Sequence, residues 1–454
     1  MNLIPRRWLL LAVMCVGMFL VLLDATVVNV ALPQIRVSLA ATFAGQQWVV
    51  DGYAVVLASL LLGGGAAGDR YGHKRIVLIG LGVFGIASLI CGVAPNIDSL
   101  ITGRALQGLG AALLLPGTLA IITHAFPERE EQARAVGVWA GVSSLALPAG
   151  PLLGGALVSF LGWRSIFLIN LPVIMVAAPA TVWLVAESVD GRGRRLDLLG
   201  SVLAAITLGT AVFAIISGEH GGVSIGVVLS VVTAGVALLA FLCWEGRASD
   251  PLLPLRLFRA PAFVGANLVA AAMNLVGVGT VFISTLYLQT VQHHSPLEAG
   301  VMLLPLFIPL AVFSPLTGRL AGRYGPRAPM SIGLLIGAFG SASLIGLSPS
   351  SSYLRFLPVL LGLGLGMSLM TAAIVAAAVQ ALPADRAGLA SGVNNAARQA
   401  AGALGIAIYG AIAGSPTESQ HFATGLHYLG LTAVILWLAA IVLAWLTIRP
   451  LRAS

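Results

Sequence analysis

Two ionisable residues, Asp24 and Arg104, lie inside long apolar stretches of the 454-residue chain. Charged groups inside a bilayer are costly, and they usually mark an ion or proton pathway. Measured from the outer ends of their predicted spans, Arg104 lies roughly 8 Å deep and Asp24 roughly 12 Å deep. The two side chains could therefore meet and neutralise each other. Protonation of Asp24 would break such a pair, as a proton-driven carrier requires; a static structural ion pair is the alternative.

The composition is that of a membrane protein, because 58% of the residues are hydrophobic and only 9% are charged. A soluble domain is about a quarter charged. Apolar stretches of spanning length recur throughout, at residues 8–32, 47–67, 76–94, 99–123, 132–160, 166–187, 198–217, 223–245, 262–290, 297–317, 328–348, 353–379, 386–414 and 425–448. These fourteen spans predict an all-α protein of the lipid bilayer.

The basic residues predict the orientation, because arginine and lysine favour cytoplasmic loops. With the N-terminus inside, all but five of the 24 basic residues fall in inside segments. Both termini are therefore expected to be cytoplasmic, in the cytoplasmic (inner) membrane. The net charge of +8 does not indicate a nucleic-acid partner, since these residues alternate with spans rather than cluster with aromatics.

An internal repeat relates the two halves of the chain. GAAGDRYG at 65–72 matches GRLAGRYG at 318–325, and each run follows the second span of its half. Parallel duplication of a six-helix unit is a known transporter architecture. We therefore expect a six-helix bundle over 1–187, two inserted transmembrane helices with linkers over 188–260, and a second six-helix bundle over 261–454.

The repeated loop itself could control a moving helix pair. Its glycines permit a tight turn, and Asp69 with the neighbouring basic residues could bridge helix ends and favour one conformation. The alternative is an ordinary positively charged inside loop. In the second copy Gly322 replaces Asp69, whereas Arg323 and Gly325 keep the pattern of the first copy.

The fifth span is rich in proline and small residues. Pro148 and Pro151 interrupt helical hydrogen bonding and predict a kink. Three glycines thin one face, so that a neighbouring helix can pack closely; they are Gly150, Gly154 and Gly155. The segment is either a pivot between inward-facing and outward-facing states or a plain packing face.

Amides within the spans could line a substrate cavity or simply join helices by hydrogen bonds. The cavity candidates are Asn29, Asn274, Asn394 and Gln399. Asp51, near the outer end of the second span, is expected to be solvated at the interface. The chain shows no metal-ligand spacing, nucleotide-binding loop or soluble domain, so we expect no cofactor, no metal and no enzyme activity.

Several runs resemble the signature sequences of the fourteen-helix drug:proton antiporters of the major facilitator superfamily, including actinomycete antibiotic exporters such as methylenomycin resistance proteins. These runs are LLDATVVNVALP (22–33), GDRYGHK (68–74), GRALQGLG (103–110), GPLLGG (150–155), WRSIFLINLP (163–172), PLLPLRLFR (251–259), SPLEAG (295–300) and ASGVNNAARQAAGALG (390–405). The resemblance implies the major facilitator fold, with two six-helix bundles plus two extra helices.

The resemblance also implies roles for individual residues. Asp24 would be linked to protonation and Arg104 to proton coupling. The conformational gating loop would comprise Gly65, Asp69, Arg70 and Gly72. The antiporter motif would comprise Gly137, Gly150, Pro151, Gly154 and Gly155, with Ala146 and His73 departing from the usual residues.

The function implied is proton-coupled efflux of drugs or antibiotics across the cytoplasmic membrane by alternating access. The partners would be protons and a small amphipathic or cationic drug-like substrate, and the chain would function as a monomer. The alternative is a dedicated exporter of one endogenous metabolite, an antibiotic or a siderophore.

Overall fold

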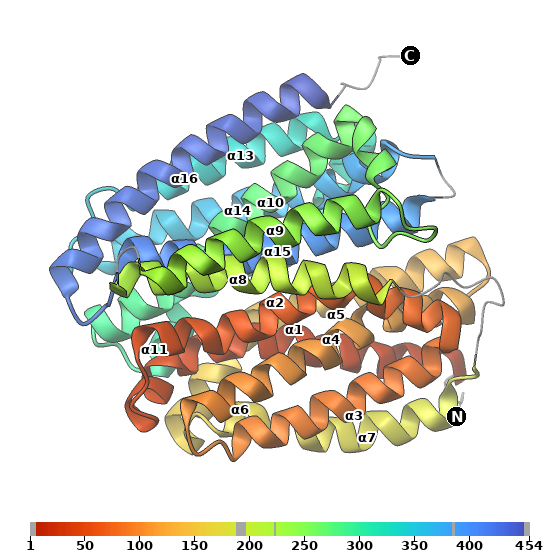
Figure 1. Ribbon diagram of the computed structural model, residues 1–454, viewed down its shortest axis with the longest axis horizontal. Coiled ribbons are helices and arrows are strands. Elements are labelled where there is room, and N and C mark those ends of the chain that lie inside the picture. Colours follow the sequence, from red (N-terminus) through yellow and green to blue (C-terminus); the bar gives the residue numbers. More distant parts are fainter. Residues whose placement is uncertain (1–5, 188–196, 222–223, 384–385, 449–454) are drawn as a thin grey trace. The chain divides into compact units, whose positions relative to one another are not determined.

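The computed structural model describes residues 6–187, 197–221, 224–383 and 386–448 (Figure 1). Within these ranges the secondary structure is helical, without a strand. The first helices are α1 (Arg6–Ser38), α2 (Phe43–Tyr71), α3 (His73–Gly92), α4 (Ile97–Ala125), α5 (Arg129–Leu161), α6 (Ser165–Leu168), α7 (Asn170–Leu184), α8 (Leu198–Gly221) and α9 (Ile225–Glu245).

After a short 3-10 helix, η1 (Leu255–Arg259), the chain is again helical. The later elements are α10 (Pro261–Leu286), a π-helical turn η2 (Tyr287–Val291), α11 (Pro296–Met302), α12 (Leu304–Tyr324), α13 (Arg327–Ala342), α14 (Tyr353–Gln380), α15 (Ala387–Ala413) and α16 (Ser419–Thr447). The all-α prediction is therefore confirmed.

Each of the fourteen predicted spans overlaps helical structure, but fewer helices qualify as spans by themselves. In the described part of the chain, eleven helices are long and apolar enough to cross a membrane, or up to twelve if α11 and α12 form one bent span. Two further predicted spans correspond to α13, which has only 16 residues, and to α15, which carries several polar residues. The count of fourteen stays a prediction.

Two predicted spans contain an interruption, although the first of them still qualifies as one span, Ser165–Leu184. The span at 166–187 divides into the short α6 and the longer α7, and the span at 297–317 divides into α11 and α12 with a bend of 41°. In contrast, α5 is one helix from Arg129 to Leu161, despite Pro148 and Pro151 inside it.

By their contacts, the helices fall into two compact units. The first unit comprises residues 1–206 with 243–252, and the second comprises residues 207–242 with 253–454. The predicted three-part division at 187 and 260 stays a prediction. Within the first unit α2 and α3 pack against α4, α1 packs against α5, and α3 contacts α7. Within the second unit α12 and α13 pack against α14, α10 packs against α15, and α13 contacts α16. The same pattern of pairs is thus present twice.

The repeated loops share a backbone feature as well as a sequence. Gly72 ends α2 with a φ of 100°, and Gly325 ends α12 with a φ of 79°. Only glycine adopts such values without strain. In both loops an arginine also lies over the ring of the next residue: Arg70 is 5.5 Å from Tyr71, and Arg323 is 5.3 Å from Tyr324. The turn that joins each helix pair is therefore built alike.

Candidate functional site

The structure brings Asp24 of α1 and Arg104 of α4 together in the first unit. Nη1 of Arg104 donates a hydrogen bond to Oδ2 of Asp24, and neither side chain is exposed to any extent. A buried ion pair is maintained only when its remaining donors and acceptors are also satisfied. The surroundings of the pair therefore matter as much as the pair itself.

Two amides complete the coordination of the carboxylate. Nε2 of Gln107 and Nδ2 of Asn170 donate to Oδ1 of Asp24, at 3.1 and 3.2 Å. The same two nitrogens donate to Oγ of Ser88, at 2.9 and 3.1 Å. Asp24 thus accepts three hydrogen bonds from side chains. This is the arrangement of an ionised carboxylate, since a protonated acid must itself donate.

The guanidinium of Arg104 is held by three helices. Its Nε donates to the carbonyl of Val49 in α2 at 3.0 Å, and Nη1 also donates to Oε1 of Gln107 at 2.8 Å. Its central carbon lies 4.5 Å from the centre of the Tyr53 ring, which favours a cation. Nη2 has no hydrogen-bond partner within the described chain. The network therefore ties α1, α2, α3, α4 and α7 around one buried carboxylate.

Gln107, Asn170 and Ser88 were not predicted as site residues. Gln107 lies three residues after Arg104, so helical spacing places both on one face of α4 and could have identified it. Asn170 is an isolated amide in an apolar stretch, a signal that does not specify a partner. Ser88 is small and common in spans, so nothing in the sequence marks it.

The glycines of α5 contact α1 beside Asp24. A Cβ atom on Gly150 would collide with Oγ1 of Thr26, and one on Gly154 would lie 2.7 Å from Cγ2 of Val27. Gly137, at the other end of the motif, has open space where a Cβ would lie. The predicted close packing thus involves Gly150 and Gly154. The residues that they contact in α1 lie within three positions of Asp24.

The first repeated loop differs from our expectation. Asp69 lies 3.2 Å from Nε2 of His73, and no ion pair joins it to the neighbouring basic residues in the described chain. Glu187, three residues after the end of α7, contacts those basic residues instead: its Oε1 accepts from the backbone nitrogen of Lys74 at 3.2 Å, and its Oε2 lies 3.5 Å from Nε of Arg75. Sequence analysis missed Glu187 because it lies at the end of a span, where a charged residue is ordinary.

The predicted cavity amides have different surroundings. Asn29 approaches the carbonyl of Ala25 in its own helix at 3.4 Å. Asn394 is almost fully buried and donates to Oδ1 of Asn267 at 3.2 Å, so it joins α15 to α10. Asn274 is buried, and Gln399 is half-buried. A role of these four amides in substrate binding stays a prediction.

The expectation that Asp51 is solvated is wrong. Its side chain is fully buried, and neither carboxylate oxygen has a hydrogen-bond partner among the described residues. The depth of a residue along a helix predicted an interfacial position, but the direction of the side chain depends on packing that the sequence does not reveal.

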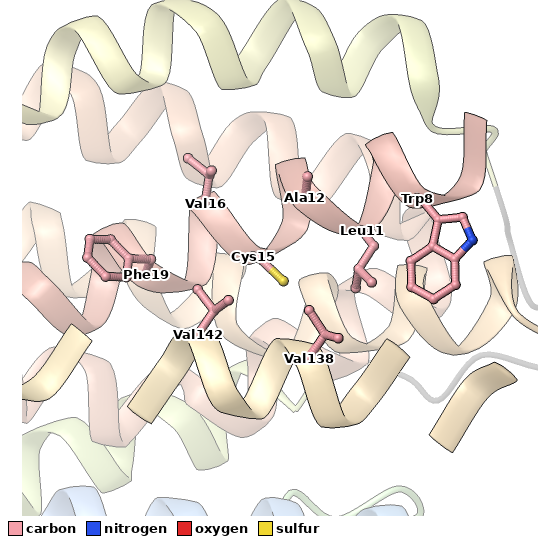
Figure 2. A pocket seen from close by; sticks show the side chains of 8 residues that line it. All are labelled: Trp8, Leu11, Ala12, Cys15, Val16, Phe19, Val138 and Val142. Atoms are coloured by element: carbon pink, nitrogen blue, oxygen red, sulfur yellow. The ribbon is translucent and has the colours of Figure 1, made fainter. Parts of the chain in front are cut away.

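One apolar cavity of about 400 Å³ lies between α1 and α5 (Figure 2). It is lined by Trp8, Leu11, Ala12, Cys15, Val16, Phe19, Val138 and Val142. None of the predicted cavity amides and neither member of the buried ion pair is among these residues. The lining offers apolar contacts rather than charge recognition.

Comparison with known proteins identifies the family. Residues 14–406 match the Major Facilitator Superfamily. The chain is 39% identical over 400 residues to the multidrug resistance protein Stp of Mycobacterium tuberculosis, covering 87% of this chain and 74% of that protein. It is 36% identical over 427 residues to a methylenomycin A resistance protein of Streptomyces coelicolor, covering 92% and 90%.

Solved structures agree on the fold. A peptide transporter, POT, crystallised with sulfate, matches with a TM-score of 0.72 at 15% sequence identity, covering 97% of this chain and 95% of that one. At this identity the likeness concerns architecture alone. Together with the family match and the repeated helix pairings, these similarities show that the chain belongs to the Major Facilitator Superfamily.

Proposed function

We propose that the protein exports drugs or antibiotics across the cytoplasmic membrane, by alternating access, in exchange for protons. The buried Asp24–Arg104 pair carries this proposal, because an ionisable group inside a bilayer is costly and usually marks an ion or proton pathway. The names of the relatives, which are multidrug and antibiotic resistance proteins, support export of drug-like molecules. Both termini would lie in the cytoplasm, and one chain would suffice.

The network suggests how a proton changes the first unit. Protonation removes the negative charge that attracts Arg104, and the new O–H group needs an acceptor where three donors now converge. The hydrogen bonds from α4 and α7 to α1 would therefore weaken together. Gly150 and Gly154 carry no side chain on the face of α5 that contacts α1, so α1 would then be able to shift along α5.

The repeated loop would act at the cytoplasmic end of the same unit. Glu187 holds the start of α3 through Lys74 and Arg75, so α7 and the loop would move as one body. Since α7 begins at Asn170, a shift that starts at Asp24 has a direct route to this loop. The second loop, with Arg323 and Gly325, would gate the other half.

A dedicated exporter of one metabolite remains the second candidate. The methylenomycin A resistance protein, which matches over 92% of this chain, is named for a single compound. A panel of growth-inhibition assays in cells that lack their own exporters would separate the two. Protection against one compound alone indicates the dedicated exporter, and protection against unrelated compounds indicates multidrug export.

The proton-coupling step can be tested in inside-out membrane vesicles. Uptake of ethidium is measured after a pH gradient, acidic inside, is imposed on vesicles with wild-type protein, Asp24→Asn or Asp98→Asn. Asp98 is an exposed carboxylate in the first turn of α4 and serves as the matched control. We expect Asp24→Asn alone to abolish gradient-driven uptake. Normal uptake by this variant at equal membrane content would refute the proposed coupling.

A further inference from the structure

Arg398 carries a charge into the middle of α15 without an internal counter-ion. It lies eleven residues after the start of the helix. Its side chain is half-buried, and its Nε is enclosed with no hydrogen-bond acceptor in the described part of the chain. The described carboxylates likewise include none within ion-pair distance of it. An unpaired charge inside a bundle is costly, so its retention calls for a partner from elsewhere.

The neighbours of Arg398 show which face of α15 it occupies. Asn394, one turn earlier, donates to Asn267 of α10. Gly402, one turn later, faces α10 as well, since a Cβ on it would lie 3.4 Å from Cγ2 of Val278. Residues four apart share a helix face. Arg398 therefore emerges from the face of α15 that packs on α10.

Helical geometry places a second polar residue at the same level. The two contacts, Asn267 with Asn394 and Val278 with Gly402, show that α10 and α15 run in the same direction. Asn274 lies between Asn267 and Val278 on the same face of α10. It is buried, and its amide forms no hydrogen bond within the described chain. A guanidinium and a free amide thus occur at one level of this helix pair.

We propose that Arg398, together with Asn274, binds an anionic group of the exported molecule. The planar guanidinium presents paired donors that fit a carboxylate, sulfonate or phosphate, and an amide can add one more donor. The substrates would then include amphipathic acids and zwitterions, in addition to the cations expected from the sequence. This assignment rests on the proposed export function, whose substrate class it specifies.

Two xanthene dyes of opposite charge test the assignment. Gradient-driven uptake of carboxyfluorescein, an anion, and rhodamine 6G, a cation, is measured in inside-out vesicles. The proteins compared are wild type, Arg398→Gln, Arg398→Lys and the control Arg355→Gln, which removes an exposed arginine. We expect Arg398→Gln to reduce carboxyfluorescein uptake roughly tenfold to hundredfold and to change rhodamine 6G uptake less than twofold. Arg398→Lys should recover part of the loss.

Several outcomes would overturn the proposal. An equal loss for both dyes would show that Arg398 supports the fold or the transport cycle in general. If the wild-type protein transports rhodamine 6G but not carboxyfluorescein, the export function stands and the proposed anion site is refuted. If neither dye moves, the export function fails, and equilibrium binding of carboxyfluorescein to nanodisc-embedded protein still decides: equal affinity of wild type and Arg398→Gln contradicts the anion site.

Discussion

Arg104 in the first unit and Arg398 in the second unit both carry a charge inside a helix, yet only Arg104 has a carboxylate partner in the described chain. Arg104 meets Asp24, Gln107 and a carbonyl of α2. Arg398 has an enclosed nitrogen without an acceptor. When GLG at 108–110 is aligned with GLG at 364–366, the position equivalent to Arg104 in the second half is Leu360, which is fully buried. A duplicated architecture has thus diverged: the first unit neutralises its charge internally, and the second leaves its charge available.

In the mechanism that we propose, this difference separates the two tasks of an antiporter. A charge pair that is satisfied internally responds to protonation, because a proton changes the partner of the arginine. An arginine without a partner in the described chain, such as Arg398, would respond to a ligand that supplies the missing charge. Variants that affect one unit and spare the other therefore test whether the two units have these separate roles.

Arg104→Lys should have the largest effect. An ammonium cannot reproduce the bonds from Nε and Nη1 in two directions, and breaking a buried pair costs about 3–5 kcal/mol. We expect drug resistance to fall to the level of cells without the protein. Arg398→Lys, which keeps a charge where no fixed geometry is present, should retain resistance to cations. Wild-type resistance in an Arg104→Lys strain at equal expression would contradict the distinction.

Asn170→Ala should have the second-largest effect. Asn170 donates to an ionised carboxylate, and such a bond contributes about 1.5–3 kcal/mol, against about 1 kcal/mol for a neutral pair. The matched change in the second unit is Asn267→Ala, which removes the acceptor of Asn394. The thermal unfolding midpoint in detergent should fall further for Asn170→Ala, and only this variant should impair gradient-driven ethidium uptake. Equal loss of uptake in both would argue against a special role for the first unit.

Gly154→Ala probes the packing of the two corresponding helix pairs. A methyl group would lie 2.7 Å from Cγ2 of Val27 and 3.1 Å from its carbonyl oxygen, and overpacking of this kind costs about 1–3 kcal/mol. At Gly402 the nearest atom, on Val278, is 3.4 Å away, which is nearly an ordinary contact. We expect a lower unfolding midpoint for Gly154→Ala and little change for Gly402→Ala. The reverse order would mean that α15 packs more tightly at Gly402 than α5 does at Gly154.

Glu187→Gln should have the smallest effect, because its ion pair with Arg75 is long and partly exposed. Exposed pairs contribute about 0.2–1 kcal/mol, which corresponds to a change of about 1.4-fold to fivefold in a transport rate. Arg323→Gln, in the second loop, removes a stacked arginine that has no ion pair among the described residues, and we expect it to change the rate less. Initial rates of ethidium uptake measure both. A complete loss for Glu187→Gln would show that the loop carries more of the mechanism than its exposed contacts indicate.

The helices and the ion pair could be predicted from sequence because both depend on local properties. Hydropathy identifies a span without knowledge of its neighbours, and two isolated charges in separate spans have few ways to be neutralised. The interruption between α6 and α7 and the bend between α11 and α12 could not be predicted, since the hydropathy that identifies a span does not report a local change in the helix.

The remaining site residues depend on how the helices are rotated. Asn170, Asn274 and Asn394 are alike in sequence, but one binds a carboxylate, one forms no bond in the described chain and one binds an amide. Asp51 shows the same limit, because its depth was estimated but the direction of its side chain was not. Rotation is decided by close contacts such as Gly154 with Val27, which no single-sequence pattern encodes.

Cys91 adds a means of observing the first unit without a label. It is fully buried, and its Sγ lies 3.4 Å from Oε1 of Gln107, the amide that contacts both Asp24 and Arg104. The S–H stretching band of a thiol falls in an infrared window free of other protein bands, and its frequency follows the strength of the hydrogen bond. With Cys15 and Cys243 replaced by serine, the natural thiol would be the single vibrational reporter of each proton that enters the bundle.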